Sequence, residues 1–290
     1  MGIQHSQGGD PQVPTGVSMT AIVVAQARDK ESARPDRLFE DPLAEAFVAA
    51  VWSTTLPQVA DLLQIYPYLI DYFAIRTRFL DEYLLTACAA GCRQVVVLAA
   101  GLDTRAFRLA WPKGVRLFEL DLPEVFTFKE QMLARQSARP ACQRIVVEAD
   151  LREEWSAPLI QASFRPEEPT AWLAEGILLY LTEEENDQLL TKISQLSASG
   201  SRLAFDHTSQ NLQQLSLLRQ ANVALDELGV SWQSVLADPA MWLVSHGWQA
   251  EVSDATSRAA HYSRPVPSLE ELTKVKDARW WLVRAVPNPT

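Results

Sequence analysis

The stretch VVVLAAGLDTRAFRL, Val95 to Leu109, passes from an apolar run to a single glycine and then to a helical pattern. This order is typical of the first strand and turn of a nucleotide-binding α/β sheet. The apolar run of this stretch is the first of five short apolar runs, and enough chain lies between successive runs for crossover helices. They span 94–100, 115–121, 144–150, 170–176 and 201–207. Strands alternating with helices predict βαβ units and a parallel sheet that is buried on both faces.

The flanking sequence predicts further parts of one α/β domain. Residues 18–91 have helical periodicity and predict an N-terminal helical cap, with Asp41 and Pro42 starting one helix and Gly91 ending another. We expect a flexible tail at 1–17 and a single domain at 18–290. Within that domain we expect a core at 92–207, a helical insertion at 208–245 and final strands at 246–290.

Composition restricts the partners of this chain. Of 290 residues, 48% are hydrophobic and 21% are charged, which is enough apolar material for a full core. The net charge of −10 argues against nucleic acid or an anionic membrane as the main partner. The three cysteines form no disulfide framework, which favours a reducing, cytoplasmic setting. Cys88 and Cys92 lie four apart, but no second pair accompanies them, so we predict small core residues and no metal.

The N-terminus gives two weaker signals. No run approaches the ~20 apolar residues of a transmembrane helix, and no signal-peptide pattern is present. MGIQHS matches the loose myristoylation pattern through Gly2 and Ser6. A pattern this short is common by chance, so a polar tail is the alternative.

Four of the five runs end in an acid, at the edge where ligands of open parallel sheets bind. These acids are Asp121, Asp150, Glu175 and Asp206. One strand-end acid often only caps a helix, but four together favour a ligand site. Asp121 lies 20 residues after Gly101, the spacing of acids that accept hydrogen bonds from ribose hydroxyls. Asp150 is placed to accept from an adenine amino group, and the Leu151 backbone N–H to serve a ring nitrogen.

The turn after the first run lacks the glycines of a phosphate-binding loop. A turn against a pyrophosphate needs G-x-G-x-x-G, but these six positions read Ala99, Ala100, Gly101, Leu102, Asp103 and Thr104. Asp103 would repel phosphates. The turn therefore favours an adenosine that has no phosphates and carries a positive group, and S-adenosylmethionine fits this description.

A methionine tail also brings a carboxylate, which needs a cation. In a helix, Arg76 falls in one row with Leu69, Phe73, Leu80 and Tyr83, where it interrupts an apolar stripe. An arginine on a core-facing row needs an anion, either the cofactor carboxylate or one of the strand-end acids. Arg78 lies in a different row with Asp71 and Glu82, where a surface ion pair suffices.

The ordered set of motifs resembles the leucine carboxyl methyltransferase-like branch of class I S-adenosylmethionine-dependent methyltransferases. That branch includes many bacterial methyltransferases and polyketide-synthesis O-methyltransferases. The matching stretches are RPDRLFEDPLAEAF (34–47), FAIRTRFLDEYL (73–84), Val95 to Leu109, FELDLPEV (118–125), EADLRE (148–153), AWLAEGILLYLTEEE (171–185) and RLAFDH (202–207). The resemblance implies a Rossmann-like mixed sheet of seven strands with helices on both faces and the last strand antiparallel.

By position, the resemblance also assigns the cofactor site. Arg76 is expected to hold the cofactor carboxylate, and Ala99, Ala100 and Gly101 to pass under the methionine part. Asp103 is expected to bind the amino group, to cap the following helix, or both. Further contacts are expected at Asp121 with Leu122, at Asp150 with Leu151, and at Glu175 with Gly176. Family members often have Gly-Ala-Gly at the turn, so the methyl group of Ala99 must be accommodated.

Methyl transfer is an in-line displacement that depends on alignment and a dry site. We expect O-methylation of a carboxylate or hydroxyl of a small, aromatic or polyketide-like acceptor. Tyr180 is a candidate contact to substrate or cofactor, with packing as the alternative. His207 is a candidate substrate contact, or the base if the acceptor is a hydroxyl, with a turn or cap role as the alternative. A protein C-terminal carboxylate is the alternative acceptor. An NAD(P)-dependent oxidoreductase or a non-catalytic binding protein are alternatives of another class. A monomer or a homodimer is expected.

Overall fold

The computed structural model describes residues 17–52, 59–213, 231–264 and 266–288, together with residues 219, 222, 223 and 226. The predicted flexible tail at 1–17 lies outside these ranges, except for its last residue. The myristoylation-like pattern at Gly2 and Ser6 also lies outside them. Most residues between 214 and 230, in the middle of the expected insertion, also lie outside these ranges. The division of the chain into the parts expected above stays a prediction.

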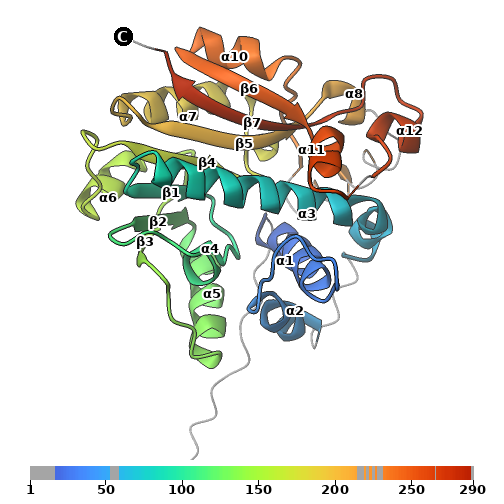
Figure 1. Ribbon diagram of the computed structural model, residues 1–290, viewed down its shortest axis with the longest axis horizontal. Coiled ribbons are helices and arrows are strands. Elements are labelled where there is room, and N and C mark those ends of the chain that lie inside the picture. The colour runs from blue at the N-terminus through green and yellow to red at the C-terminus, as the bar shows by residue number, and fades with distance from the viewer. Residues whose placement is uncertain are drawn as a thin grey trace, which may run out of the picture.

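Within the described residues, seven strands form one sheet in the order β3-β2-β1-β4-β5-β7-β6 (Figure 1). Strands β1 to β5 are parallel, and β7 is antiparallel to β5 and β6. Their bounds are Gln94–Leu98 (β1), Arg116–Asp121 (β2), Gln143–Glu148 (β3), Thr170–Ala174 (β4), Arg202–Thr208 (β5), Trp248–Asp254 (β6) and Trp280–Pro287 (β7). The predicted seven-stranded mixed sheet with an antiparallel last strand is confirmed.

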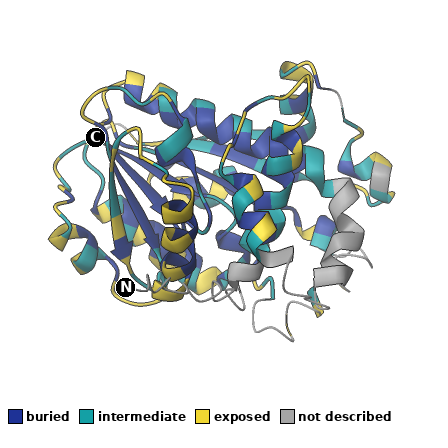
Figure 2. Ribbon diagram, turned by 90° about the horizontal axis from the view of Figure 1, so that it is seen from below, coloured by how far each residue is buried: buried dark blue, intermediate teal, exposed yellow. Residues whose placement is uncertain are grey.

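Each strand supplies two cores because successive side chains point to opposite faces. Val95 and Val97 of β1 pack on the face covered by the long helix α3 (Val59–Ala89). Val96 and Leu98 pack on the other face, against α6 (Ser156–Gln161) and α7 (Glu183–Gln195). The central strands are accordingly buried between two helical layers (Figure 2).

The N-terminal helices α1 (Val17–Ser32) and α2 (Ala44–Trp52) pack together beside α3. The second helix begins at Ala44, two residues after the predicted start, and Asp41 accepts a hydrogen bond from the Leu43 backbone N–H at 3.2 Å just before it. Its buried carboxylate pairs with Arg28 at 2.8 Å and accepts a hydrogen bond from Thr104 at 2.7 Å, which ties α1 to the turn after β1. Gly91 follows α3 with φ of +114°, a left-handed conformation that glycine adopts without strain.

The remaining helices connect the strands. They are α4 (Arg105–Arg108), α5 (Pro123–Arg135), the 3₁₀ turn η1 (Leu178–Tyr180), α8 (Gln210–Gln213), α10 (Pro239–Ser245), α11 (Ala255–His261) and α12 (Leu269–Thr273). The sequence did not predict α11 and α12, which lie between β6 and β7. These helices are too short to show a clear period. Asp254 and Ser268 start them by accepting hydrogen bonds from Thr256 and Glu271 backbone N–H groups.

The described helices include none long and apolar enough to cross a bilayer. Cys88, Cys92 and Cys142 are free thiols, and the first two are buried, as expected of small core residues.

Candidate functional site

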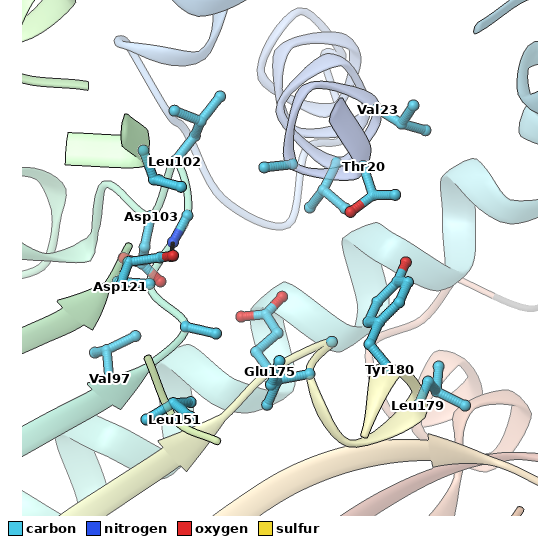
Figure 3. Close-up of a pocket in the computed structure, with 18 of the residues that line it drawn as sticks. Thr20, Val23, Val97, Leu102, Asp103, Asp121, Leu151, Glu175, Leu179 and Tyr180 are labelled. Carbon is cyan, nitrogen blue, oxygen red and sulfur yellow. Dashed lines mark hydrogen bonds between the residues drawn. The ribbon is translucent and has the colours of Figure 1, made fainter. Parts of the chain in front are cut away.

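A cavity of about 250 Å³ opens at the carboxyl ends of β1 and β4. The chain leaves β1 toward β2 on one side, while β4 lies on the other side, so this is the switch point where open α/β sheets bind ligands. In Figure 3, Asp121, Asp103 and Leu102 lie on one side of the cavity, and Thr20, Val23 and Tyr180 lie on the other. The carboxylate of Glu175 lies between the two groups.

The structure brings nearly all predicted site residues to this cavity. All eleven proposed cofactor contacts line it, and so does Tyr180. The cofactor set is Arg76, Ala99, Ala100, Gly101, Asp103, Asp121, Leu122, Asp150, Leu151, Glu175 and Gly176. His207 is absent from the lining.

Asp121 ends β2 and faces the turn after β1. Its Oδ2 accepts a hydrogen bond from the Gly101 backbone N–H at 2.6 Å, and its Oδ1 accepts one from the Leu122 N–H at 2.7 Å. Burial raises the pKa of Asp121, and the two backbone hydrogen bonds oppose that rise. The carboxylate is thus fixed in orientation, and its remaining lone pairs are available to a ligand.

The turn itself uses left-handed backbone at Ala99 and Gly101, both with φ of +49°. A Cβ at Gly101 would lie 3.4 Å from the Ala21 Cβ, so α1 passes directly over this turn. Gly176, at the end of β4, has φ of +66°, and a Cβ there would lie 3.5 Å from Arg76 Nη1. The two glycines leave the backbone open on the cavity side, whereas Ala99 retains its methyl group in a conformation that L-residues disfavour.

Arg76 is buried between two of the strand-end acids. Its Nη1 donates to Asp206 at 2.9 Å, and its Nε lies 2.9 Å from Glu175 Oε1. Asp206 also accepts from the Gly176 backbone N–H and from Trp280 Nε1. We expected the anion beside Arg76 to be either the cofactor carboxylate or a strand-end acid. Two strand-end acids are present, and Arg76 also lines the cavity. Arg78 makes the expected surface pair, with Glu82 at 2.9 Å.

Sequence reasoning missed Arg105, the second buried cation of the site. Its Nε donates to Asp81 at 2.7 Å, and its Nη1 donates both to Glu175 at 2.6 Å and to Asp103. Asp103 also accepts from the Arg105 backbone N–H at 2.7 Å. It lies one residue before Thr104, which is the N-cap of α4, so the expected N-cap position was off by one residue. One feature of the sequence could have pointed to Arg105. It follows Asp103 by two residues, at the start of a helical pattern.

The two arginines determine the charge state of the acids between them. Burial alone would raise the pKa of Asp103, but Arg105 outweighs it and holds that pKa at about 2. Burial likewise opposes ionisation of Glu175, and Arg105 and Arg76 lower its pKa below the ordinary value. Both carboxylates are therefore ionised at neutral pH and face the cavity as acceptors.

The end of the cavity beneath β3 is more open. Asp150 pairs with Arg152 at 2.6 Å, and that hydrogen-bonded pair lowers the pKa of Asp150. Leu151 and Val97 lie together on this side (Figure 3). An acid beside an apolar floor is a suitable surface for a flat heterocycle with an amino group.

The opposite end of the cavity is apolar and aromatic. It is lined by Val23, Val24, Leu69, Phe73, Leu179, Tyr180, Trp232 and Trp280, with Thr20 from α1 beside Tyr180. Burial raises the pKa of Tyr180, and its neighbours Trp232 and Thr20 lower it in part, so its hydroxyl is neutral. The N-terminal helices were expected to wall off the acceptor pocket, but no residue of α1 was named, because a helical stripe alone does not show which residues face a cavity.

The position of His207 corrects the prediction of a base at that residue. Asp206 points to the α3 face of β5, so the next side chain points to the α7 face. There His207 is buried beside Ser234, with Nε2 3.2 Å from the Ser234 Oγ and Nδ1 accepting from the Thr208 N–H. Burial lowers its pKa. His207 lines a different cavity, together with Ser234 and Trp242, and is not carried into the proposed function below.

The amino-acid sequence matches the leucine carboxyl methyltransferase family over residues 21–194. The chain belongs to this family. A Parafrankia protein named "Putative S-adenosyl-L-methionine-dependent methyltransferase" is 46% identical over 271 residues, which cover 91% of this chain and 86% of that protein. A Streptomyces coelicolor protein of the same description is 43% identical over 264 residues, which cover 89% of this chain and 92% of that protein. This chain is therefore an S-adenosylmethionine-dependent methyltransferase.

Solved structures support the fold. The crystal structure of a Thermobifida fusca protein described as a "putative methyltransferase" superposes on the enzyme with a TM-score of 0.62 at 16% identity, covering 98% of this chain and 99% of the other. A Streptomyces avermitilis structure superposes with a TM-score of 0.58, also at 16% identity. The arrangement of the sheet and its helices is thus shared where few residues are identical.

The cavity residues fit the methyl donor. S-adenosylmethionine carries one carboxylate, one ammonium and one sulfonium group, and so has a net positive charge. The cavity of the methyltransferase is lined by four carboxylates and three guanidinium groups, an excess of one negative charge. A Cβ at Gly101 or Gly176 would contact the side chain of Ala21 or Arg76, which also line the cavity.

Proposed function

We propose that the methyltransferase transfers the methyl group to an oxygen atom of a small aromatic molecule. The observation that carries this proposal is the division of one cavity into a carboxylate-lined half and an aromatic half, with Glu175 between them. Glu175 marks the methionine end of the cofactor, so the aromatic half is the place for the acceptor. The family relationship gives the reaction class but does not select the acceptor.

In the proposed assignment, Asp121 accepts hydrogen bonds from the ribose hydroxyls and Asp150 accepts from the adenine amino group. The backbone of Leu122 and Leu151 lies alongside. Because Asp103 and Glu175 are ionised, they can accept from the methionine ammonium group. Arg76, which faces the cavity, is the cation for the methionine carboxylate.

The bound cofactor supplies an electrophilic methyl group on a sulfonium. The chain supplies alignment and dryness, which can account for much of the acceleration of a displacement reaction. Phe73, buried and edge-on to Trp280 at 5.6 Å between ring centroids, gives the acceptor half a rigid wall. The hydroxyl groups of Thr20 and Tyr180 hydrogen-bond to each other at this end of the cavity, and an acceptor would be oriented beside this pair.

Calorimetry with the pure protein tests the cofactor assignment. S-adenosylhomocysteine and S-adenosylmethionine are expected to bind and NAD is not. Asp121→Ala should weaken both affinities by about tenfold or more, because charge-assisted hydrogen bonds contribute ~1.5–3 kcal/mol. Glu124→Ala is the matched control, since Glu124 is exposed on the first turn of α5 and does not line the cavity. An unchanged affinity of Asp121→Ala would remove this residue from the site.

A further inference from the structure

We propose that a second cavity, on the α7 face of the sheet, binds a small organic cation that consists of an ammonium group on an apolar arm. This cavity has a volume of about 210 Å³ and lies between η1, α7, β5 and α10. One ordered water needs only ~10–15 Å³ of such space, so the cavity has room for a small molecule. The two cavities share no lining residue among those described, so this site goes beyond the proposed function and does not rest on it.

One wall of this cavity is a set of neutral hydrogen bonds around Ser234. The Ser234 hydroxyl gives its proton to the Leu178 carbonyl at 2.7 Å, so its oxygen accepts from His207 Nε2 at 3.2 Å. The other ring nitrogen, Nδ1, accepts from the Thr208 backbone N–H at 2.9 Å. Burial lowers the pKa of His207, in agreement with a neutral imidazole. This wall therefore brings no positive charge to the cavity.

Asn186 adds a buried acceptor to the same wall. The residue is 6% exposed and lines the cavity. Its Nδ2 donates to the Leu178 carbonyl and to the Ser234 Oγ, each at 3.0 Å, and these bonds use both amide hydrogens. The amide oxygen, Oδ1, is buried and accepts no hydrogen bond from any described residue. Because a buried acceptor is normally paired, this oxygen calls for a ligand that donates.

The mouth of the cavity is negatively charged. Glu183 and Asp187 line it from the exposed side of α7. One oxygen of Asp187 accepts from Trp242 Nε1 at 2.7 Å and lies 3.4 Å from His246 Nε2. Neither lysine nor arginine belongs to the described lining. A cleft lined by charges of one sign attracts the opposite charge, so this cavity selects a cation.

The start of α7 at this cavity does not make it an anion site. A capping box already occupies the helix start, since the Thr182 side chain accepts from the Glu185 N–H and the Glu185 side chain accepts from the Thr182 N–H. Glu183 places a further carboxylate in the same turn. A bound anion would find those two N–H groups engaged and would face like charge.

The rest of the lining accounts for the apolar arm. It consists of aliphatic side chains and one indole, from Leu178, Val235, Leu236 and Trp242. An ammonium group that donates to Asn186 Oδ1 and to the carboxylates at the mouth would leave its carbon chain against these side chains. A ligand with both parts satisfies the buried acceptor and covers apolar surface at once.

Calorimetry with the intact enzyme and cyclohexylmethylamine tests the proposal, in saturating S-adenosylhomocysteine so that the cofactor site is filled. The matched ligand is cyclohexylmethanol, which has nearly the same shape and no charge. The amine should bind at least about tenfold more tightly than the alcohol, because charge-assisted hydrogen bonds are the stronger ones. Combining Glu183→Gln with Asp187→Asn should remove about this advantage. Glu184→Gln, exposed on the same turn and outside the lining, should leave it unchanged.

A variant that fills the cavity locates the bound amine. Leu236→Trp keeps every polar group of the wall and should abolish amine binding, while the affinity for S-adenosylhomocysteine stays within about twofold, as for independent sites. Equal binding of amine and alcohol overturns the proposal. Amine binding that survives both the double substitution and Leu236→Trp overturns it too, because the amine then lies elsewhere. If the amine does not bind at millimolar concentration while S-adenosylhomocysteine does, the second site is wrong and the proposed function stands.

Discussion

Arg105 is the residue on which the charges of the site depend, because it contacts Asp81, Asp103 and Glu175 at once. Asp81 retains Arg108 and Glu175 retains Arg76 if Arg105 is removed, but Asp103 is left buried without a cation. Arg105→Gln should therefore destabilise the protein by about 3–5 kcal/mol at pH 7, the cost of breaking a buried ion pair. Urea unfolding measures this. Arg37→Gln, which breaks the exposed pair of Arg37 with Glu40, should cost at most about 1 kcal/mol.

The loss of stability in Arg105→Gln should also depend on pH, in a direction that the pKa of Asp103 determines. In the native enzyme the pKa of Asp103 is lowered to about 2, so its stabilising contribution is complete above its ordinary pKa of 3.8 and is lost as the pH falls through 2. Without Arg105, burial should raise the pKa of Asp103. Acidification then protonates this carboxylate and removes the free-energy cost of burying its charge in the variant. The stability difference between native enzyme and variant should be largest near pH 7 and should shrink toward pH 3. A difference that is constant over this range contradicts the assignment.

Ala99 carries a methyl group at the position of the turn where the resemblance led us to expect glycine. Its φ of +49° is disfavoured for an L-residue by ~1–2 kcal/mol. Ala99→Gly removes this strain but adds unfolded-state entropy worth ~0.4–1 kcal/mol. We expect the variant to be as stable as the native enzyme or up to about 1 kcal/mol more stable in urea unfolding. Ala100→Gly is the control, since Ala100 is buried without positive φ, and it should destabilise. Equal losses at both positions would show that Ala99 is not strained.

The strand elements explain both what the sequence predicts and what it misses. Runs of apolar residues buried on both faces predict the parallel strands, and the acids that end them predict the cavity, since strand ends meet at one edge. Arg105 is invisible to such patterns because its partners come from α3, the β1 turn and the end of β4. His207 was expected beside Asp206 at the cavity. It lies on the opposite face of the sheet, since adjacent side chains of β5 face opposite layers.

That alternation predicts different effects at neighbouring positions of β5. Asp206→Asn removes a charge that holds Arg76 and should weaken S-adenosylmethionine binding by about tenfold, because an ion pair behind the site is broken. His207→Asn changes the opposite face and should leave the affinity within about twofold, although stability falls. Calorimetry compares the two variants, with circular dichroism to confirm folding. An affinity loss as large in His207→Asn as in Asp206→Asn would return His207 to the site.

At the scale of the whole molecule, the N-terminal helix α1 covers the cavity, and the sheet supplies its floor. Thr20, Ala21, Val23, Val24 and Arg28 all line the cavity from this helix. Side-chain hydrogen bonds from Arg28 to Asp41 and to the Leu102 carbonyl tie α1 to α2 and to the β1 turn. A ligand held between floor and cover must stabilise the cover against local opening whenever opening abolishes binding.

Hydrogen exchange should therefore report cofactor binding at α1. With S-adenosylmethionine at 100 times its Kd, local opening should be opposed by about 2.7 kcal/mol, and the amides of α1 should exchange up to about 100-fold more slowly. Amides of α10 are the control, because this helix packs against β6 and contributes no residue to the cavity lining. Protection confined to the ends of β1, β2 and β4, with α1 unchanged, would mean that the cofactor binds the sheet alone and that α1 opens freely over it. Equal protection in α1 and α10 would indicate global stabilisation only, so the contrast between the two helices decides whether α1 is the cover of the site.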